Sequence, residues 1–197
     1  MSVQVSQSSF LQATIYPLNF GGILRPTMGG PDQLLNRLGN RFGVTVEVGE
    51  LSSSSLEGRR LRQQLLQGQT QGVIFTFPQD GGDTGTQGVP RVNGGAQSGN
   101  TLVIDGVTPG YNAYEGQAIS VSTAAIWYLY TVNAAATANG SGQLTLSITP
   151  MLRRSPNDND IVELETPLIE GFLTSDVSWV YTPGNWQGMS FTIEETR

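Results

Sequence analysis

The sequence of 197 residues contains no cysteine, no histidine and no lysine, and its ten basic residues are all arginine. Without these residue types the chain has no disulfide, no thiol or amine nucleophile, no imidazole base and no zinc site of the usual kind. Charged residues make up only 13% of the chain, about half of what globular domains carry. Carboxylates are the main catalytic groups left, so we expect a protein that is not an enzyme and that holds no cofactor and no metal ion.

Long apolar runs are missing as well, since no stretch approaches the roughly 18 residues that span a bilayer. The N-terminal segment MSVQVSQSS has neither the basic start nor the apolar centre of a secretion signal. We therefore expect synthesis in the cytoplasm and no membrane insertion. The net charge of −6 argues against tight nucleic-acid binding, because neutralising phosphates requires clustered Lys or Arg.

One convincing helix is present, and it runs into a buried strand. Ser54 is the predicted N-cap, Glu57 completes a capping box three residues later, and Gly68 is the predicted stop. The predicted apolar stripe of this helix consists of Leu61, Leu65 and Leu66. The β-branched and aromatic residues 73–77 then predict a strand. Because one helix cannot bury its stripe alone, we expect it to lie on a sheet.

The remaining periodicity is that of strands separated by turns. Alternation predicts strands at 11–18 and 44–48, whereas glycine and proline predict a loop over 20–32. Residues 32–38 predict a short helix capped by Asp32, and residues 81–100 predict a linker or long surface loop. A closing hairpin is predicted at 171–181 and 186–194, with Met189, Phe191 and Ile193 on one face.

Between these parts the sequence predicts a small all-β module with strands at 101–105, 116–121, 125–132, 143–149 and 161–165. Its best hairpin is 125–132 with 143–149, joined by a projecting loop. The expected fold is mainly β, a β-sandwich carrying one α-helix with an inserted small β-barrel or sandwich module. The expected domains are a discontinuous one, 1–80 plus 168–197, and an inserted one, 81–167.

Five segments follow one another in a recognisable order: LEGRRLRQQLLQG, VIFTFP, GVPRVNGGAQSGNTLVIDG, LTLSITPMLRRSPNDNDIVELETP and an aromatic-rich hairpin. This order resembles the distal tail proteins of long, flexible-tailed bacteriophages, the siphophages. The resemblance covers residues 55–195, and its most specific parts are 93–105 and 149–162. The stretch 118–130 departs from the family pattern, because it is more apolar and aromatic.

The resemblance implies a structural virion protein that forms a ring, a homohexamer in the family, at the distal end of the tail. The ring joins the tail tube protein to the proteins of the tip hub or baseplate. The implied location is the virion, after synthesis in the host cytoplasm. The family pattern carries no catalytic motif, and no catalytic, cofactor-binding or metal-binding residue follows from it.

Charged residues near position 155 are candidates for a contact between subunits. Arg153, Arg154, Asp158 and Asp160 would supply complementary patches for a head-to-tail ring contact. The alternative is a solvated turn, and we favour it. The same turn, 157–160, offers oxygen ligands for calcium but lacks the spacing of an EF-hand, so we expect an ordinary turn.

Aromatic residues offer a second function. Trp127, Tyr128 and Tyr130 are candidates for a platform on which sugars stack. Strand alternation, however, sends Trp127 and Leu129 to one side and the two tyrosines to the other, so at least one pair should be core or a subunit contact. The alternative function is thus a carbohydrate-binding module of a phage tip or other surface assembly, centred on Trp127 or Trp186.

Three carboxylates and one glycine complete the candidates. Glu163, Glu165 and Glu170 invite comparison with glycosidases, but nothing in the sequence pairs them across a cleft. Gly58 lies inside the helix, where glycine costs about 1 kcal/mol against alanine. We take it as a sign that the helix backbone approaches its sheet or a neighbouring subunit closely.

The leading interpretation is a ring-forming building block whose edge strands and loops pair with the next copy. Six copies at −6 each would place −36 around the ring. An acidic bore would let DNA pass without binding, since cationic groups anchor phosphate.

Overall fold

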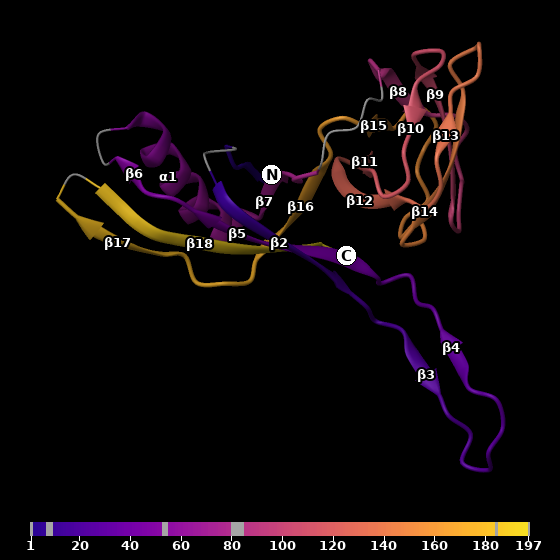
Figure 1. The fold of residues 1–197 in the computed structure, drawn as a ribbon, viewed down its shortest axis with the longest axis horizontal. Coiled ribbons are helices and arrows are strands. Elements are labelled where there is room, and N and C mark those ends of the chain that lie inside the picture. The colour runs from indigo at the N-terminus through magenta and orange to yellow at the C-terminus, as the bar shows by residue number, and fades with distance from the viewer. Residues whose placement is uncertain (1, 7–9, 53–54, 80–84, 184, 197) are drawn as a thin grey trace.

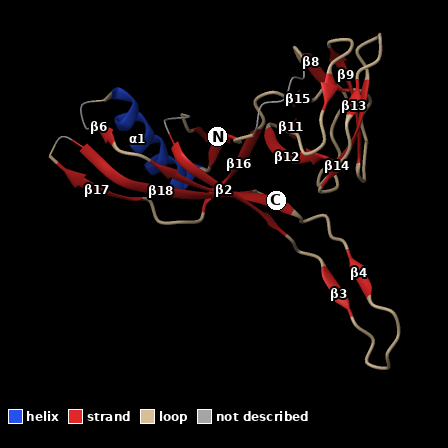
Figure 2. Ribbon diagram, viewed as in Figure 1, coloured by secondary structure: helices blue, strands red, loops and turns tan. Residues whose placement is uncertain are grey.

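The computed structural model describes residues 2–6, 10–52, 55–79, 85–183 and 185–196, and it shows a main sheet, one helix and a closed barrel (Figure 1). The expected fold class, mainly β with one helix and a small barrel module, is confirmed. Figure 2 shows that the helix lies with the main sheet, whereas the barrel consists only of strands and loops.

The main sheet has eight strands and is built from both ends of the chain. Its central order is β1-β7-β16-β18-β5-β2, and β6 and β17 pair with β18 outside that path. The bounds are β1 (Val3–Gln4), β2 (Phe10–Leu18), β5 (Arg41–Val48), β6 (Leu51–Ser52), β7 (Val73–Thr76), β16 (Leu168–Leu173), β17 (Ser178–Thr182) and β18 (Asn185–Glu195).

Alternation divides the sheet into two faces. Val44, Val46 and Val48 on β5 are buried, as the sequence predicted. They are paired with Ile193, Phe191 and Met189 on β18, which are buried as well. Residues between them, such as Thr45 and Glu47, lie on the opposite face. The helix α1 (Leu56–Gln71) packs its buried Leu61 and Leu65 into the same core as the valines.

The ends of α1 differ from the prediction. Ser54 lies outside the described residues, and the N-cap is Ser55, whose Oγ accepts from Gly58 N at 3.1 Å. The predicted stop at Gly68 is wrong, because the helix continues to Gln71 and the left-handed residue is Gly72, with φ 80°. Gly68 instead lies on the buried face, where a methyl group would collide with Val73 Cγ1.

The buried stripe of α1 also differs in part. Its members are spaced by three or four residues: Gly58, Leu61, Leu65 and Gly68. Leu66 is one residue past that line and is exposed, so its predicted place in the stripe is wrong. Gly58 does lie on the buried side. The close backbone approach predicted at Gly58 stays a prediction.

Two predictions between β2 and β5 are wrong. The predicted loop 20–32 contains β3 (Gly22–Leu24), and the predicted helix 32–38 contains β4 (Gln33–Leu35). These two strands pair with each other and continue the β2–β5 hairpin into an arm that projects from the body (Figure 1). A helix of seven residues has too few internal hydrogen bonds to form alone, whereas the hairpin gives each strand a partner.

The barrel is closed by six strands in the order β11-β12-β14-β9-β8-β15. Their bounds are β8 (Gly88–Val92), β9 (Thr101–Val107), β11 (Ala118–Thr123), β12 (Ile126–Val132), β14 (Leu144–Thr149) and β15 (Ile161–Glu163). Five of them match the predicted strands to within a few residues. The predicted linker 81–100 is wrong over β8, which pairs with both β9 and β15 and so closes the barrel.

The predicted best hairpin of the barrel is only partly formed. β12 and β14 pair through Thr131 and Val132 alone, whereas β11 and β12 pair over their whole lengths. The loop predicted to project between β12 and β14 contains β13 (Ala136–Thr137), which pairs with β10 (Asn112–Ala113). The tight turn of the β11–β12 hairpin is made by Ala124 and Ala125 at φ 52° and 61°.

Candidate functional site at the junction of sheet and barrel

Two buried residues tie the barrel to the main sheet. Arg153 lies four residues after the end of β14 and donates from Nη2 to Glu195 Oε1 at 2.5 Å. Their side chains are 5% and 1% exposed. The guanidinium also lies over the rings of Tyr128 and Tyr130, 5.1 and 5.6 Å from their centroids. This arrangement is a buried ion pair wrapped by aromatic faces, and its two partners come from different parts of the fold.

Glu195 accepts backbone hydrogen bonds from both sides of the junction. Its Oε1 accepts from Leu129 N in the barrel and its Oε2 from Phe42 N in the main sheet, each at 2.8 Å. Burial raises the pKa of the Glu195 carboxyl above its ordinary value, although Arg153 and the two N–H groups offset part of that rise. Because both oxygens already accept from N–H donors, we assign the ionised carboxylate. Burial lowers the pKa of Arg153, but the contributions of Glu195 and Tyr130 raise it by more, so the pKa lies above its ordinary value.

A second carboxylate repeats this arrangement two residues earlier on β12, at Trp127 instead of Leu129. Glu170 on β16 is buried, and its Oε2 accepts from Trp127 N at 2.9 Å, while its Oε1 accepts from Ser2 Oγ. Trp127 and Leu129 belong to the part of β12 that β14 leaves unpaired. The two carboxylates therefore stand where a neighbouring strand would otherwise accept these hydrogen bonds.

Further contacts fix the junction. Gln79, at the start of the connection into the barrel, accepts from Ala118 N at 3.0 Å and donates to Glu165 O at 2.9 Å. Leu168 N donates to Ser120 Oγ at 3.0 Å. The side chains of Ala118 and Leu129 are buried in the core of the main sheet although both residues belong to barrel strands. The barrel is thus docked by packing as well as by polar contacts.

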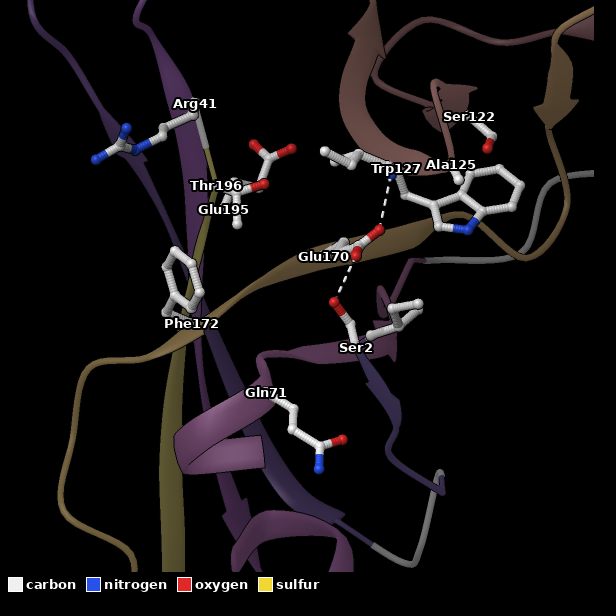
Figure 3. Close-up of a pocket in the computed structure, with 12 residues that line it drawn as sticks. Ser2, Arg41, Gln71, Ser122, Ala125, Trp127, Glu170, Phe172, Glu195 and Thr196 are labelled. Atoms are coloured by element: carbon white, nitrogen blue, oxygen red, sulfur yellow. Dashed lines mark hydrogen bonds between the residues drawn. The ribbon is translucent and has the colours of Figure 1, made fainter. Parts of the chain in front are cut away.

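A cleft of about 1060 Å³ lies beside the junction. One wall is the β11–β12 hairpin, with Ser122, Ala125 and Trp127. The opposite wall and the floor come from the main sheet and the end of α1, with Ser2, Gln71, Glu170 and Phe172. Figure 3 shows Glu170 between Trp127 and Ser2, with the Arg41 guanidinium directed away from it. Among the described residues, the buried hydroxyl of Thr196, which also lines the cleft, has no hydrogen-bond partner.

Within one copy the four charged residues near position 155 do not come together, and their contact with another subunit stays a prediction. Arg153 points into the junction, whereas Arg154 and Asp158 are exposed. Asp160 accepts from Asn157 N within its own turn, and Asp158 accepts from Gly94 N in the segment after β8, each at 2.8 Å. Among the described residues no group of three or more acidic side chains could hold a metal ion.

The aromatic candidates separate as strand alternation predicted. Tyr128 and Tyr130 are buried in the barrel core, and burial raises the pKa of Tyr130. Leu129 and Trp127 face the main sheet, Leu129 in its core and Trp127 in the cleft. The side chain of Trp186 lies outside the described part of the chain.

The three candidate glutamates do not share a cleft. Glu163 accepts from Gln87 Nε2 at 2.8 Å and Glu165 from Gln87 N at 2.7 Å, next to the connection that enters the barrel. Only Glu170 lines the junction cleft. Sequence reasoning missed Glu195, although a signal was present. Glu195 continues the alternation Met189, Phe191, Ile193 by one more step and so falls on the buried face.

In the described part of the chain, the two-residue strands β1 and β6 and two longer strands, β2 and β17, border the main sheet. The outer edge of β2 and the outer edge of β17 have no partner strand among the described residues. Between them the order is β17-β18-β5-β2, so these edges lie on opposite sides. Leu11 on β2 and Val180 on β17 are 78% and 59% exposed.

One face of these strands is polar and is not covered by α1. It carries Gln12 and Thr14 opposite Glu47 and Thr45, and the Oγ1 atoms of Thr45 and Thr192 are 3.0 Å apart. Tyr16 lies over Gly43 and donates to Glu194 at 3.4 Å. Burial raises the pKa of Tyr16, and the negative charge of Glu194 raises it as well. Residues 12–16, 43–47 and 190–194 include two carboxylates and no arginine.

No protein-family model matches the chain, and no curated protein sequence matches it. Within the described part of the chain, α1 is the one helix and it is neither long nor apolar enough to cross a membrane.

Proposed function

We propose that the chain is a structural protein that closes into a ring with copies of itself at the distal end of a phage tail, between the tail tube and the hub. The observation that carries the proposal is the pair of unpaired edges, β2 and β17, on opposite sides of one sheet. An open edge presents free N–H and C=O groups that pair readily with another strand. Two different edges favour a head-to-tail contact, and head-to-tail contacts generate rings when the rotation closes.

The projecting arm supports an assembled state. Its strands have three residues each and no second layer, and an isolated two-stranded ribbon is only marginally stable in water. Its apolar side chains are nevertheless exposed: Ile23, Leu24, Met28, Leu34 and Leu38. Several large apolar side chains exposed on one projecting hairpin favour a contact with a partner. In the ring, we expect the arm to pack against the neighbouring copy.

The polar face would line the bore of such a ring. Pairing of β2 with β17 continues the sheet from copy to copy, so α1 and the barrel stay outside and Glu47 and Glu194 face inward. An acidic bore repels the phosphates of DNA and lets it pass. The test is to measure whether the protein binds a short DNA duplex at low salt, and we expect no binding. Binding that weakens steeply with salt would contradict an acidic bore.

Edge substitutions test the ring directly. The chain has a mass of 21.1 kDa, so six copies give about 127 kDa by light scattering. We expect Leu11→Lys or Val180→Lys to give monomers, because a charged side chain on an edge opposes pairing. Leu66→Lys on the solvent side of α1 is the control and should leave the mass unchanged.

Mixing the two edge variants separates head-to-tail pairing from other contacts. Each variant keeps one intact edge, so Leu11→Lys and Val180→Lys together should form a 1:1 dimer of about 42 kDa that cannot grow. A wild-type protein that remains a monomer at all concentrations, or edge variants that still form the full ring, would refute the proposal. Replacing residues 21–39 by a two-residue turn should weaken the ring while the body keeps its thermal stability.

A further inference from the structure

We propose that the cleft between the β11–β12 hairpin and β16 binds a neutral carbohydrate, a function separate from ring assembly. The cleft has a volume of about 1060 Å³, slightly above the range of about 300–1,000 Å³ that small-molecule sites occupy. It is formed by two parts of the fold that are fixed to each other by Glu195 and Glu170. A site of this size between rigid walls is large enough for a short oligosaccharide.

Each wall contributes an aromatic ring. Trp127 comes from the barrel, and Phe172 comes from the main sheet, where it is 59% exposed. Neither ring belongs to a hydrophobic core, since Trp127 is half-buried and Phe172 is exposed. Aromatic rings offer flat apolar area, and the C–H faces of sugar rings are the apolar surface of an otherwise polar ligand.

The polar groups of the cleft suit hydroxyl groups. Ser2 and the Trp127 N–H hold the Glu170 carboxylate in place, and each of its oxygens keeps acceptor capacity for a ligand hydroxyl. Gln71 at the end of α1 is exposed and offers both a donor and an acceptor. The Thr196 hydroxyl is buried without a partner among the described residues, and a ligand hydroxyl would satisfy it.

The charge of the lining selects a neutral ligand. Its charged residues are Arg41, Glu170 and Glu195, and Glu195 is neutralised by Arg153. The Arg41 guanidinium is directed away from Glu170 and lies over the ring of Phe20, 4.6 Å from its centroid. Among the lining residues, Glu170 therefore supplies the one uncompensated charge, and a carboxylate repels anionic ligands. No cluster of arginines is present to hold a phosphate or sulfate, and a single carboxylate that already accepts two hydrogen bonds is a weak site for a cation.

The rim of the cleft shows local backbone strain. Ala124 and Ala125 form the turn at φ 52° and 61°, where side chains other than glycine, asparagine and aspartate are uncommon. Such strain gathers at binding sites more often than elsewhere. The small methyl group of Ala125 lines the mouth of the cleft beside Trp127 and leaves it open to an extended ligand.

The test is titration of the purified full chain with three neutral trisaccharides: maltotriose, chitotriose and a galactose trisaccharide. Tryptophan fluorescence and saturation-transfer NMR report binding. We expect at least one of them to bind with millimolar affinity or better. We expect Phe172→Ala to weaken that binding at least tenfold, whereas Val180→Ala, with the same 59% exposure on β17, should leave it unchanged.

Two further measurements make the result decisive. Trp127→Ala should abolish the fluorescence change and the binding, while a melting curve close to that of the wild type shows that the variant is folded. The Leu11→Lys variant should bind the sugar as tightly as the wild type, so failure of the ring leaves this result intact. Absence of binding to all three sugars, or binding that survives both cleft substitutions, would overturn the proposal.

Discussion

Glu195→Gln probes the contact that joins the barrel to the main sheet. The substitution keeps the shape of the side chain but removes the negative charge and places an amide N–H2 group against N–H donors. Arg153, only 5% exposed in its side chain, is then a buried cation without its partner. Breaking a buried pair in this way costs about 3–5 kcal/mol of the free energy of unfolding. For a chain of this length that corresponds to a fall of roughly 6–20 °C in Tm.

The assay is urea unfolding followed by circular dichroism, with the double variant Arg153→Met, Glu195→Gln completing a cycle. We expect the double variant to be more stable than the sum of the single losses predicts, by about 2 kcal/mol, because it leaves no unpaired buried charge. Arg25→Gln is the matched control. It breaks the 3.4 Å pair with Asp32, whose side chains are 76% and 55% exposed, and should change stability by less than about 0.5 kcal/mol.

The reasoning is refuted if Glu195→Gln costs less than about 1 kcal/mol, or if the two single losses simply add. Either result would mean that water reaches the ion pair in solution and screens the two charges. The Leu129 and Phe42 N–H groups would then find other acceptors.

Three other substitutions test the packing by urea or thermal unfolding. Gly68→Ala should destabilise the protein by about 1–3 kcal/mol although alanine is the better helix former, since the new methyl collides with Val73; a higher urea midpoint would contradict this. Ala124→Asn with Ala125→Gly should stabilise the β11–β12 turn by about 1 kcal/mol, because these residues accept positive φ, and an unchanged or lower Tm would count against it. Gly171→Ala should cost more than about 3 kcal/mol, because its Cβ would collide with the Glu194 carbonyl on the paired strand, whereas Gly22→Ala on the arm, with nothing nearby, serves as the control.

Local periodicity was enough to predict the elements that bury one face. The valines of β5, the apolar positions of β18 and five barrel strands follow from alternation alone. The helix follows from its capping residues and leucine spacing, but its end does not. Gly68 has the same sequence signal whether it terminates a helix or permits close packing, and only the position of Val73 decides between them.

The misassigned segments are those whose structure depends on distant partners. β3 and β4 have no buried face, so neither shows a strand period, and each exists because the other continues the hairpin. β8 contains Gly88 and Pro90 and becomes a strand by filling the gap between β9 and β15. Of the junction, the direction of Trp127 was predictable from alternation, whereas the pairing of Arg153 with Glu195 across 42 residues was not.

The barrel enters and leaves the main sheet at neighbouring points. Phe77 N donates to Pro167 O at 2.7 Å, and Thr76 is paired with Leu168. The whole barrel is therefore equivalent, in its effect on the host, to the turn of a hairpin between β7 and β16. A different domain grafted between Phe77 and Pro167 would leave the eight strands in register. It would have to supply an apolar side chain at the place of Leu129 and a cation for Glu195.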